Sequence, residues 1–293
     1  MDNKKYQKVE SGYISASPLP NKEELEKFYR DLYYQSPQSA TYQIDYPKIE
    51  IEHKRLKNEV LMYALKNSGI ESGKFLDIGA GEGFLLQTAY DYKFSVTGID
   101  FSSFGVNKFH PELSKFLRVG DVYENIEDLI KSKEKFNIIS SINVLEHVID
   151  PELFLSKVDQ LLENDGLVSI TVPNDFSDLQ NLAVKEGLID REFWFSPPAH
   201  LHYFNTKTLP DFCIQQGYEV VDSYSDFPID IFLFHSGSNY VMDSKNGPSA
   251  HKARMLLDLL VSNSGLDRYL KFYRSMFEVG LGRDITVILK KSK

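Results

Sequence analysis

The chain has 293 residues, of which 42% are hydrophobic and 26% charged, as in ordinary globular proteins. Its formal net charge of −9 and its lack of a long basic run disfavour nucleic acid as the main partner. The single cysteine, Cys213, excludes a disulfide within the chain and a zinc site built from several thiolates.

The N-terminal stretch is polar and charged. Residues 1–10 lack the apolar core of a signal peptide. No run in the chain approaches the roughly 20 apolar residues that span a bilayer. We therefore expect a cytoplasmic protein without integral membrane association, and we expect residues 1–20 to be loosely ordered.

Two helices are predicted before the first strong strand. The first starts at Asn21, with Glu24 three residues on as its capping-box partner. The second covers about Tyr46–Asn67, with charged residues on one side and apolar residues on the other. Together they predict an N-terminal helical cap over residues 1–70.

From residue 74 onward, short apolar runs alternate with amphipathic stretches, which predicts βαβ units and a parallel sheet. One helix is predicted to begin at Pro151, with Asp150 as its cap, and to end before Gly166. Another covers about residues 206–216. The predicted strands are Lys74–Ile78, Ser95–Ile99, Phe116–Val119, Phe136–Ser140, Gly166–Val172, Tyr218–Ser223 and Asp284–Lys290.

These elements predict one main domain over residues 71–293. It carries insertions at about residues 174–205 and 227–282. The second insertion contains a helical stretch, about Ser249–Val279, with apolar residues at helical spacing. This stretch packs on the core, forms a dimer contact or lies on a membrane surface, in that order of preference.

The first strand of this domain runs into the sequence LDIGAGEG, a glycine-rich turn that lets a ligand approach the backbone closely. A dinucleotide site would place Gly or Ala where Phe84 stands, and Asp77 and Glu82 would repel a pyrophosphate. S-adenosylmethionine has no phosphate and carries an ammonium and a sulfonium, so it fits these charges better. Asp77 would act through its charge on the methionine end.

The next two predicted strands also end in an acid. Asp100 lies 17 residues after Gly83, where a carboxylate can accept hydrogen bonds from ribose hydroxyls. Asp121 would accept from an adenine amino group, with Val122 against the ring. An acid at any one of these positions is more often a helix cap. The prediction of a cofactor site therefore rests on the order and spacing of the glycine turn and the three acids.

The sequences LDIGAGEG, VTGID, GDV and INVLEHV occur in the order typical of class I S-adenosylmethionine-dependent methyltransferases. The chain resembles that superfamily from about residue 50 to 225. The resemblance implies an α/β fold with a Rossmann-like, mostly parallel sheet of seven strands, helices on both faces and an antiparallel last strand. It implies S-adenosyl-L-methionine as cofactor. The implied cofactor residues are Asp77, Gly79, Ala80, Gly81, Gly83, Asp100, Phe101, Asp121, Val122, Asn143, Val144 and Glu146.

Methyl transfer to a hydroxyl requires help with removing a proton. His200 and His147 are the candidate catalytic residues, with His202 behind them. On an extended segment, the side chains of His200 and His202 would share one face and would mimic a metal site. No third ligand is evident, so we expect no metal. The remaining alternatives are a packed turn or a wall of the acceptor pocket.

The stretch HLHYFNTKTL resembles the same region of bacterial quinone O-methyltransferases and sugar methyltransferases. In sugar C-methyltransferases it follows a Tyr-His-Glu-His run, but here Pro197 and Ala199 replace the Tyr and the Glu. The resemblance therefore favours O-methylation, with His200 as a base. The prolines would fix the approach of the segment, and Tyr203 and Phe204 would anchor it.

The preferred function is O-methylation of a small molecule, with a sugar or glycosyl intermediate slightly ahead of a quinone. An RNA or protein methyltransferase and a cofactor-binding protein without activity stay open as alternatives, and the oligomeric state is not predicted. Several aromatic residues are candidates for stacking on the acceptor, although core packing is the more common fate of each. They are Tyr33, Tyr34, Tyr42, Tyr46, Phe193, Trp194 and Phe195.

Overall fold

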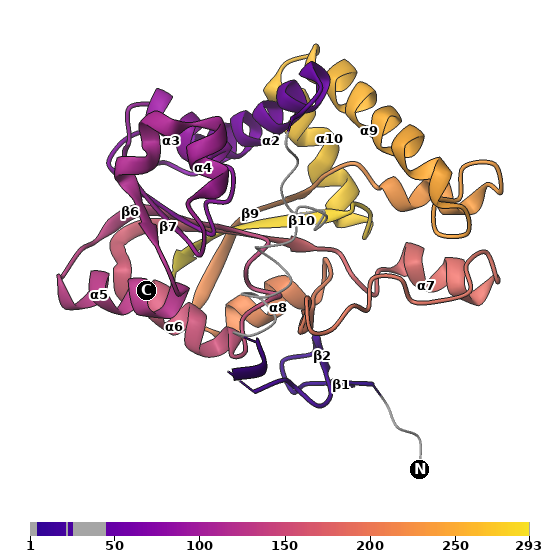
Figure 1. The fold of residues 1–293 in the computed structure, drawn as a ribbon, viewed down its shortest axis with the longest axis horizontal. Coiled ribbons are helices and arrows are strands. Elements are labelled where there is room, and N and C mark those ends of the chain that lie inside the picture. Colours follow the sequence, from indigo (N-terminus) through magenta and orange to yellow (C-terminus); the bar gives the residue numbers. More distant parts are fainter. Residues whose placement is uncertain (1–4, 22, 26–44, 293) are drawn as a thin grey trace.

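The computed structural model describes residues 5–21, 23–25 and 45–292. Its centre is a seven-stranded sheet with the strand order β5-β4-β3-β6-β7-β10-β9, and helices cover both of its faces (Figure 1). The strands are β3 (Lys74–Ile78), β4 (Ser95–Asp100), β5 (Leu117–Val119), β6 (Phe136–Ile142), β7 (Leu162–Pro173), β9 (Tyr218–Ser225) and β10 (Asp284–Lys291). The α-helices are α2 (Lys48–Asn67), α3 (Phe84–Asp91), α4 (Phe104–Phe109), α5 (Val122–Lys131), α6 (Pro151–Leu161), α7 (Asp178–Lys185), α8 (Thr208–Gln215), α9 (Gly247–Ser262) and α10 (Leu266–Glu278).

All strands of the large sheet except β10 run in the same direction. Parallel pairs join β5, β4, β3, β6 and β7 in turn. By contrast, β10 is antiparallel to both of its neighbours, β7 and β9. This topology confirms the predicted Rossmann-like α/β fold with an antiparallel last strand.

The boundaries of α6 agree with the prediction at one end only. Pro151 is its first residue, and the side chain of Asp150 caps it by accepting a backbone hydrogen bond of 2.9 Å. The predicted end before Gly166 is wrong, because α6 stops at Leu161 and β7 begins at Leu162. An added Cβ on Gly166 would approach Leu162 Cδ1 to 2.7 Å, so this glycine allows close packing within the strand.

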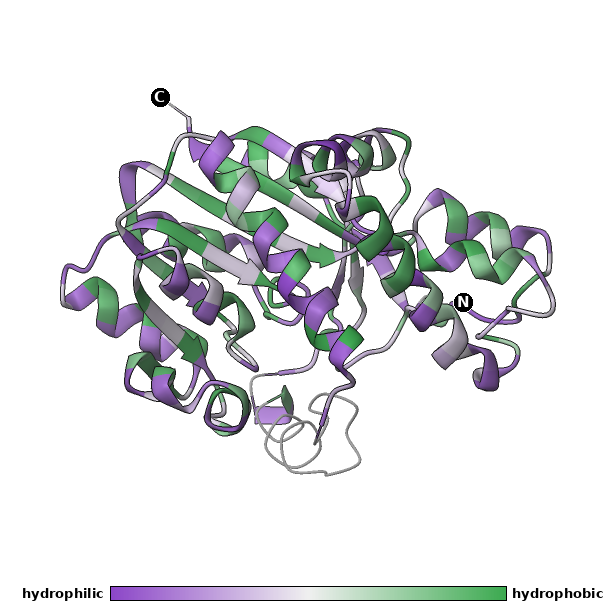
Figure 2. Ribbon diagram, turned by 90° about the horizontal axis from the view of Figure 1, so that it is seen from above, coloured by the Kyte–Doolittle hydropathy of each residue, from purple (hydrophilic) through white to green (hydrophobic). Residues whose placement is uncertain are grey.

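Alternate residues of the strands supply two hydrophobic cores, one on each face of the sheet. In β3, Leu76 and Ile78 join the core under α5, α6 and α8, whereas Phe75 joins the core under α2, α3 and α10. Figure 2 shows mainly hydrophobic strands between helices of mixed character, as a parallel sheet covered on both faces requires. Because β3, β4, β5 and β6 are parallel, their carboxyl ends lie at the same edge of the sheet.

Residues 5–20 are held by a second, three-stranded sheet, which corrects the prediction of a loosely ordered N-terminus. In it, β1 (Tyr6–Lys8) pairs with β2 (Ile14–Ala16), and β2 pairs with β8 (His202–Tyr203). Strands this short carry no periodic pattern that the sequence could reveal. The N-terminus is therefore attached directly to the segment that carries the paired histidines.

The structure describes the second predicted N-terminal helix in full but only the start of the first. The capping box at the start of the first is present, because Asn21 and Glu24 exchange two hydrogen bonds of 2.9 Å between backbone N–H and side-chain oxygen. Residues 23–25 are helical, and the rest of the predicted helix lies outside the described residues. The second helix is confirmed as α2 (Lys48–Asn67). The division into a cap over residues 1–70 and a main domain stays a prediction.

The helical insertion packs on the core, as the preferred alternative predicted. Its second helix, α10, lies on β9 and contributes Tyr269 and Tyr273 to the core. Asp258 of α9 accepts a hydrogen bond from Tyr273, and its carboxylate lies 2.7 Å from His53 Nε2 of α2. In the described part of the chain, no helix has the length and apolar character needed to cross a lipid bilayer.

We expect Asp258→Asn to lower the free energy of unfolding by about 2 kcal/mol, because it leaves a buried polar group of His53 or Tyr273 without a suitable partner. Urea denaturation measures this loss. The matched control is Glu278→Gln, an exposed acid at the end of α10, which should change the value by less than about 0.5 kcal/mol. Equal effects of the two substitutions would contradict the structural role of Asp258.

Candidate active site

The glycine turn between β3 and α3 forms an open backbone cradle. Gly79, Gly81 and Gly83 have positive φ angles of 80°, 55° and 80°, which L-residues with a side chain adopt with strain. A Cβ added to Gly79 would approach Val144 Cγ2 to 2.4 Å. Gly83 instead is the N-cap residue of α3, packs beside Val106 and lines neither of the cavities described below.

Two buried carboxyl groups stand beside this turn. Asp100 accepts hydrogen bonds from Gly81 N at 2.8 Å and from Ser102 N at 2.9 Å. Asp77 is buried, and its Oδ2 has no hydrogen-bond partner among the described residues. Burial, reinforced by the charge of Asp100, raises the pKa of Asp77 to about 7. A cationic ligand group beside Asp77 would relieve the cost of this burial.

Asp121 and Asn143 close the series of strand ends. Asp121 caps α5 by accepting a hydrogen bond from Glu124 N at 3.0 Å, so it is both a helix cap and a wall of the main cavity. Asn143 follows β6 with a positive φ of 54°, and its N–H donates to Thr171 O at 2.9 Å. This backbone conformation turns the chain sharply at the edge of the sheet.

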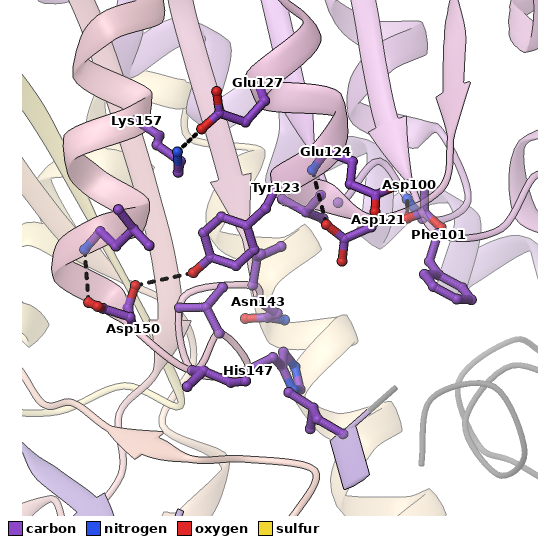
Figure 3. Close-up of a pocket in the computed structure, with 18 of the residues that line it drawn as sticks. Asp100, Phe101, Asp121, Tyr123, Glu124, Glu127, Asn143, His147, Asp150 and Lys157 are labelled. Atoms are coloured by element: carbon purple, nitrogen blue, oxygen red, sulfur yellow. Dashed lines mark hydrogen bonds and ion pairs between the residues drawn. The ribbon is translucent and has the colours of Figure 1, made fainter. Parts of the chain in front are cut away.

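A cavity of about 1020 Å³ runs along this edge. Figure 3 shows Asp100, Phe101 and Asp121 on one side of Asn143, with His147 on the other. The sequence had not singled out the walls contributed by α5 and α6, such as Tyr123, because such positions carry no motif. The predicted cofactor residues that line it are Gly79, Gly81, Asp100, Phe101, Asp121, Val122, Asn143 and Val144.

A second cavity of about 250 Å³ adjoins the first and shares Gly79 and Asn143 with it. Its walls include Asp77, Ala80 and Lys57. The Lys57 ammonium on α2 lies 3.0 Å from the carboxylates of both Asp226 and Asp284. The space thus offers groups of both charges. All the predicted cofactor residues line one of the two cavities, apart from Gly83 and Glu146.

His147 stands at the end of the main cavity, and His200 stacks against it. Their ring centroids lie 4.9 Å apart in an edge-to-face arrangement. Of the two, His147 lines the cavity. His147 Nδ1 donates to Ala199 O at 2.5 Å. Burial, together with His200, lowers the pKa of His147 to about 4, so its imidazole is neutral at pH 7.

Glu146 lies behind these rings rather than in the cavity wall. Its side chain is buried, and neither carboxylate oxygen has a hydrogen-bond partner among the described residues. Burial raises the pKa of this carboxyl well above its usual range. The backbone carbonyl of Glu146 accepts hydrogen bonds from Leu201 N at 2.8 Å and from His202 N at 3.2 Å. These bonds attach residues 197–205, here called the histidine segment, to the turn after β6.

His200 also faces a buried ion pair. Its Nδ1 lies 3.9 Å from Asp175 Oδ2, too far for a hydrogen bond. Arg283 Nη1 donates to Asp175 Oδ1 at 2.6 Å. Burial alone would raise the pKa of Asp175, but the interactions with Arg283 and His200 together outweigh it, so the net shift is downward. Asp175 is therefore a fixed anion beside His200.

His202 does not share a face with His200, so the geometry predicted for an extended segment is wrong. His202 is buried in β8, where its Nε2 lies 3.2 Å from Ile149 O and its ring packs edge-on against Tyr13. Burial lowers the pKa of His202 to about 4. The predicted anchor is confirmed, since Tyr203 and Phe204 are buried and Tyr203 donates to His200 O at 2.7 Å.

The described candidates for stacking on the acceptor do not line either cavity. Phe193, Trp194 and Phe195 belong to a third hydrophobic cluster with Phe176 and line neither cavity. Tyr46 donates to Glu82 Oε1 at 2.5 Å. Three further candidates lie outside the described residues. They are Tyr33, Tyr34 and Tyr42.

Residues 50–223, more than half of the chain, match a family of methyltransferase domains. The chain belongs to this family. Membership confirms the predicted class I S-adenosylmethionine-dependent methyltransferase. Among solved structures, the 1,6-didemethyltoxoflavin-N1-methyltransferase of Burkholderia thailandensis covers 99% of this chain and 100% of its own, with a TM-score of 0.54. At 13% identity this likeness concerns the fold alone.

Two similar proteins are ubiquinone biosynthesis O-methyltransferases. That of Glaesserella parasuis is 35% identical over 116 residues, 37% of this chain and 49% of the relative. That of Pelagibacter ubique is 35% identical over 103 residues, 34% of this chain and 42% of the relative. The chain thus spans about half the length of the curated relatives it matches.

We expect Gly79→Ala to weaken S-adenosylmethionine binding at least about tenfold, because the new methyl group would collide with Val144 in a strained backbone conformation. Isothermal titration calorimetry measures the affinity. Gly187→Ala is the matched control, since Gly187 also has a positive φ, 67°, but has nothing within 4 Å of an added Cβ. Equal losses in both variants would contradict a cradle at Gly79.

We expect cofactor affinity to fall as the pH is lowered from 7 to 5.5. The pKa of Asp77 is about 7 in the unliganded protein, so at lower pH a proton must leave before the carboxylate can attract the cofactor's ammonium. Affinity should level off above this pKa. Calorimetry across the pH range on the wild type and Asp77→Asn tests the assignment, because the weaker binding of Asp77→Asn should depend little on pH. A steep pH dependence in Asp77→Asn would assign the titration to another group.

Proposed function

We propose that the protein transfers a methyl group from S-adenosylmethionine to a hydroxyl oxygen of a small molecule. The observation that carries this proposal is one continuous cavity. Its walls include the glycine turn, Asp100, Asp121 and His147, and His200 packs against His147. Cofactor-binding groups and groups suited to acting on a hydroxyl thus meet in one space.

The residues beside the glycine turn fit the cofactor. Asp77 has an unpartnered buried oxygen that suits the ammonium of the methionine part, and Lys57 in the same small cavity suits its carboxylate. Asp100 suits the ribose hydroxyls, and Phe101 and Val122 offer apolar surface to the adenine. When bound, the cofactor supplies an electrophilic methyl group. The chain's residues hold it with the methionine part toward Asn143 and His147.

The acceptor that we propose is a hydroxylated aromatic ring of the quinol type. The names of the two bacterial relatives support this class over the sugar that the sequence favoured. An acceptor hydroxyl must lose a proton, and we assign this task to His147 and His200. His147 is the member that reaches the cavity, so it takes the position that the sequence had given first to His200.

A polynucleotide is a poor acceptor for this cavity. Its lining carries seven carboxylate side chains against two lysines, and this balance repels a phosphate backbone. The seven are Glu82, Asp100, Asp121, Glu124, Glu127, Asp128 and Asp150, and the lysines are Lys131 and Lys157. We also place the protein in the cytoplasm, since its single cysteine is a buried free thiol, as suits a reducing compartment.

We expect His200→Ala to lower methyl transfer at least about 100-fold, the usual contribution of a group that acts on a proton, while cofactor affinity stays within about twofold of the wild type. A labelled-cofactor assay measures both the acceptor class and the loss of methyl-transfer rate. The acceptors are a catechol-type quinol, a nucleotide sugar, transfer RNA and a test protein. His235→Ala, at an exposed histidine, is the control. Unchanged turnover in His200→Ala would contradict the assignment, and transfer to the sugar alone would overturn the acceptor class.

A further inference from the structure

Glu146, His147 and His200 form a cluster whose donor atoms all lie within 4.8 Å of one another. The sequence shows Glu146 and His147 as neighbours but places His200 53 residues beyond His147. The sequence reasoning looked for a third ligand beside His200 and His202, whereas the structure groups His200 with Glu146 and His147. We propose that these three side chains bind a divalent metal ion at the acceptor end of the cavity.

Glu146 is the buried member of the cluster. Its side chain is 2% exposed, and both of its oxygens lack a hydrogen-bond partner among the described residues. A buried carboxyl group without partners costs several kcal/mol, so proteins rarely keep one without a use. Arg283, a nearby cation, already donates to Asp175. A cation supplied from solution would give the Glu146 oxygens the partner that they lack.

A backbone carbonyl orients the ring of His147. Its Nδ1 donates to Ala199 O, which leaves Nε2 as the ring nitrogen with a lone pair. That Nε2 lies 3.7 Å from Glu146 Oε1. Histidines that bind metals usually donate their other N–H to a carbonyl or carboxylate in this manner. The backbone of the histidine segment thus sets the nitrogen that faces the cluster.

His200 joins the cluster from the segment between α7 and β8. Its Nδ1 is on the side of Asp175, and its ring lies edge-to-face with His147. Asp175, held by Arg283, stands behind it at 3.9 Å, where an anion supports a histidine ligand. Ligands around one ion at about 2.1 Å lie up to about 4.2 Å apart. Small side-chain rotations would therefore close the cluster on an ion.

The ligand set indicates the class of metal. Two imidazole nitrogens with one carboxylate suit first-row divalent ions such as Zn²⁺, Mn²⁺, Fe²⁺ or Co²⁺, whereas Mg²⁺ and Ca²⁺ prefer oxygen ligands throughout. Three protein ligands leave positions open for a further oxygen. His147 lines the cavity, so those positions can face a bound acceptor.

This proposal rests on the proposed function for its role in the reaction, although metal binding is testable by itself. A divalent ion lowers the pKa of a hydroxyl group that binds to it. The acceptor's O–H bond would then break with release of the proton to water, and the oxygen would keep the electron pair. His147 and His200 would thus act on the proton through the ion.

The test is a titration of tag-free, EDTA-dialysed protein with Co²⁺ alone, followed by visible absorption. We expect ligand-field bands that saturate at one equivalent. Glu146→Gln and His200→Asn should each weaken binding at least about tenfold, while His235→Ala should leave it unchanged. Variants are compared only where S-adenosylmethionine binding, measured by calorimetry, matches the wild type. Should Glu146→Gln fail this check, His200→Asn decides, since its side chain is partly exposed.

Absence of saturable Co²⁺ binding in the wild type would overturn the metal site, as would wild-type affinity in the ligand variants. The two proposals fail separately. If the protein binds the cofactor and methylates a quinol without binding Co²⁺, the metal site is contradicted and the proposed function is supported. If the protein binds Co²⁺ through these residues but methylates no small molecule, only the proposed function is contradicted.

Discussion

The site depends on how the histidine segment is fastened to the turn after β6. Two backbone N–H groups, from Leu201 and His202, donate to the carbonyl of Glu146, and His147 donates back to Ala199 O. Backbone groups that are buried must find partners, so this exchange fixes the segment. It brings His200 onto His147. The N-terminal hairpin completes the attachment, since Ala16 N donates to Leu201 O at 2.8 Å.

The parallel sheet supplies the other half of the site. Because β3, β4, β5 and β6 are parallel, their carboxyl ends gather Asp77, Asp100, Asp121 and Asn143 along one edge. Charges of one sign at a sheet edge suit a cationic cofactor and would repel a phosphate. The same edge then leads to His147. The fold thus places the proposed cofactor residues and the proposed acceptor residues along one cavity.

The sequence predicted those parts of the structure whose cause is local. The strand at Lys74–Ile78 and the cap at Asp150 follow from apolar runs and turn chemistry. Parts that depend on distant pairing could not be predicted. Strands β1 and β2 are three residues each, and they depend on pairing with each other and, through β2, with the distant β8. For the same reason, the sequence could not predict that Glu146 is buried. Nor could it predict that His202 contacts Tyr13 while His200 contacts His147.

We propose that the sheet edge with Asp77, Asp100 and Asp121 forms a single active site with His147 and His200. A crystal structure with S-adenosylhomocysteine bound would show this arrangement. We predict adenosine between Asp100 and Asp121, with the sulfur facing His147 across open space large enough for an aromatic ring. A sulfur atom turned away from His147, or a side chain filling the space between them, would show that the two groups of residues do not form one site.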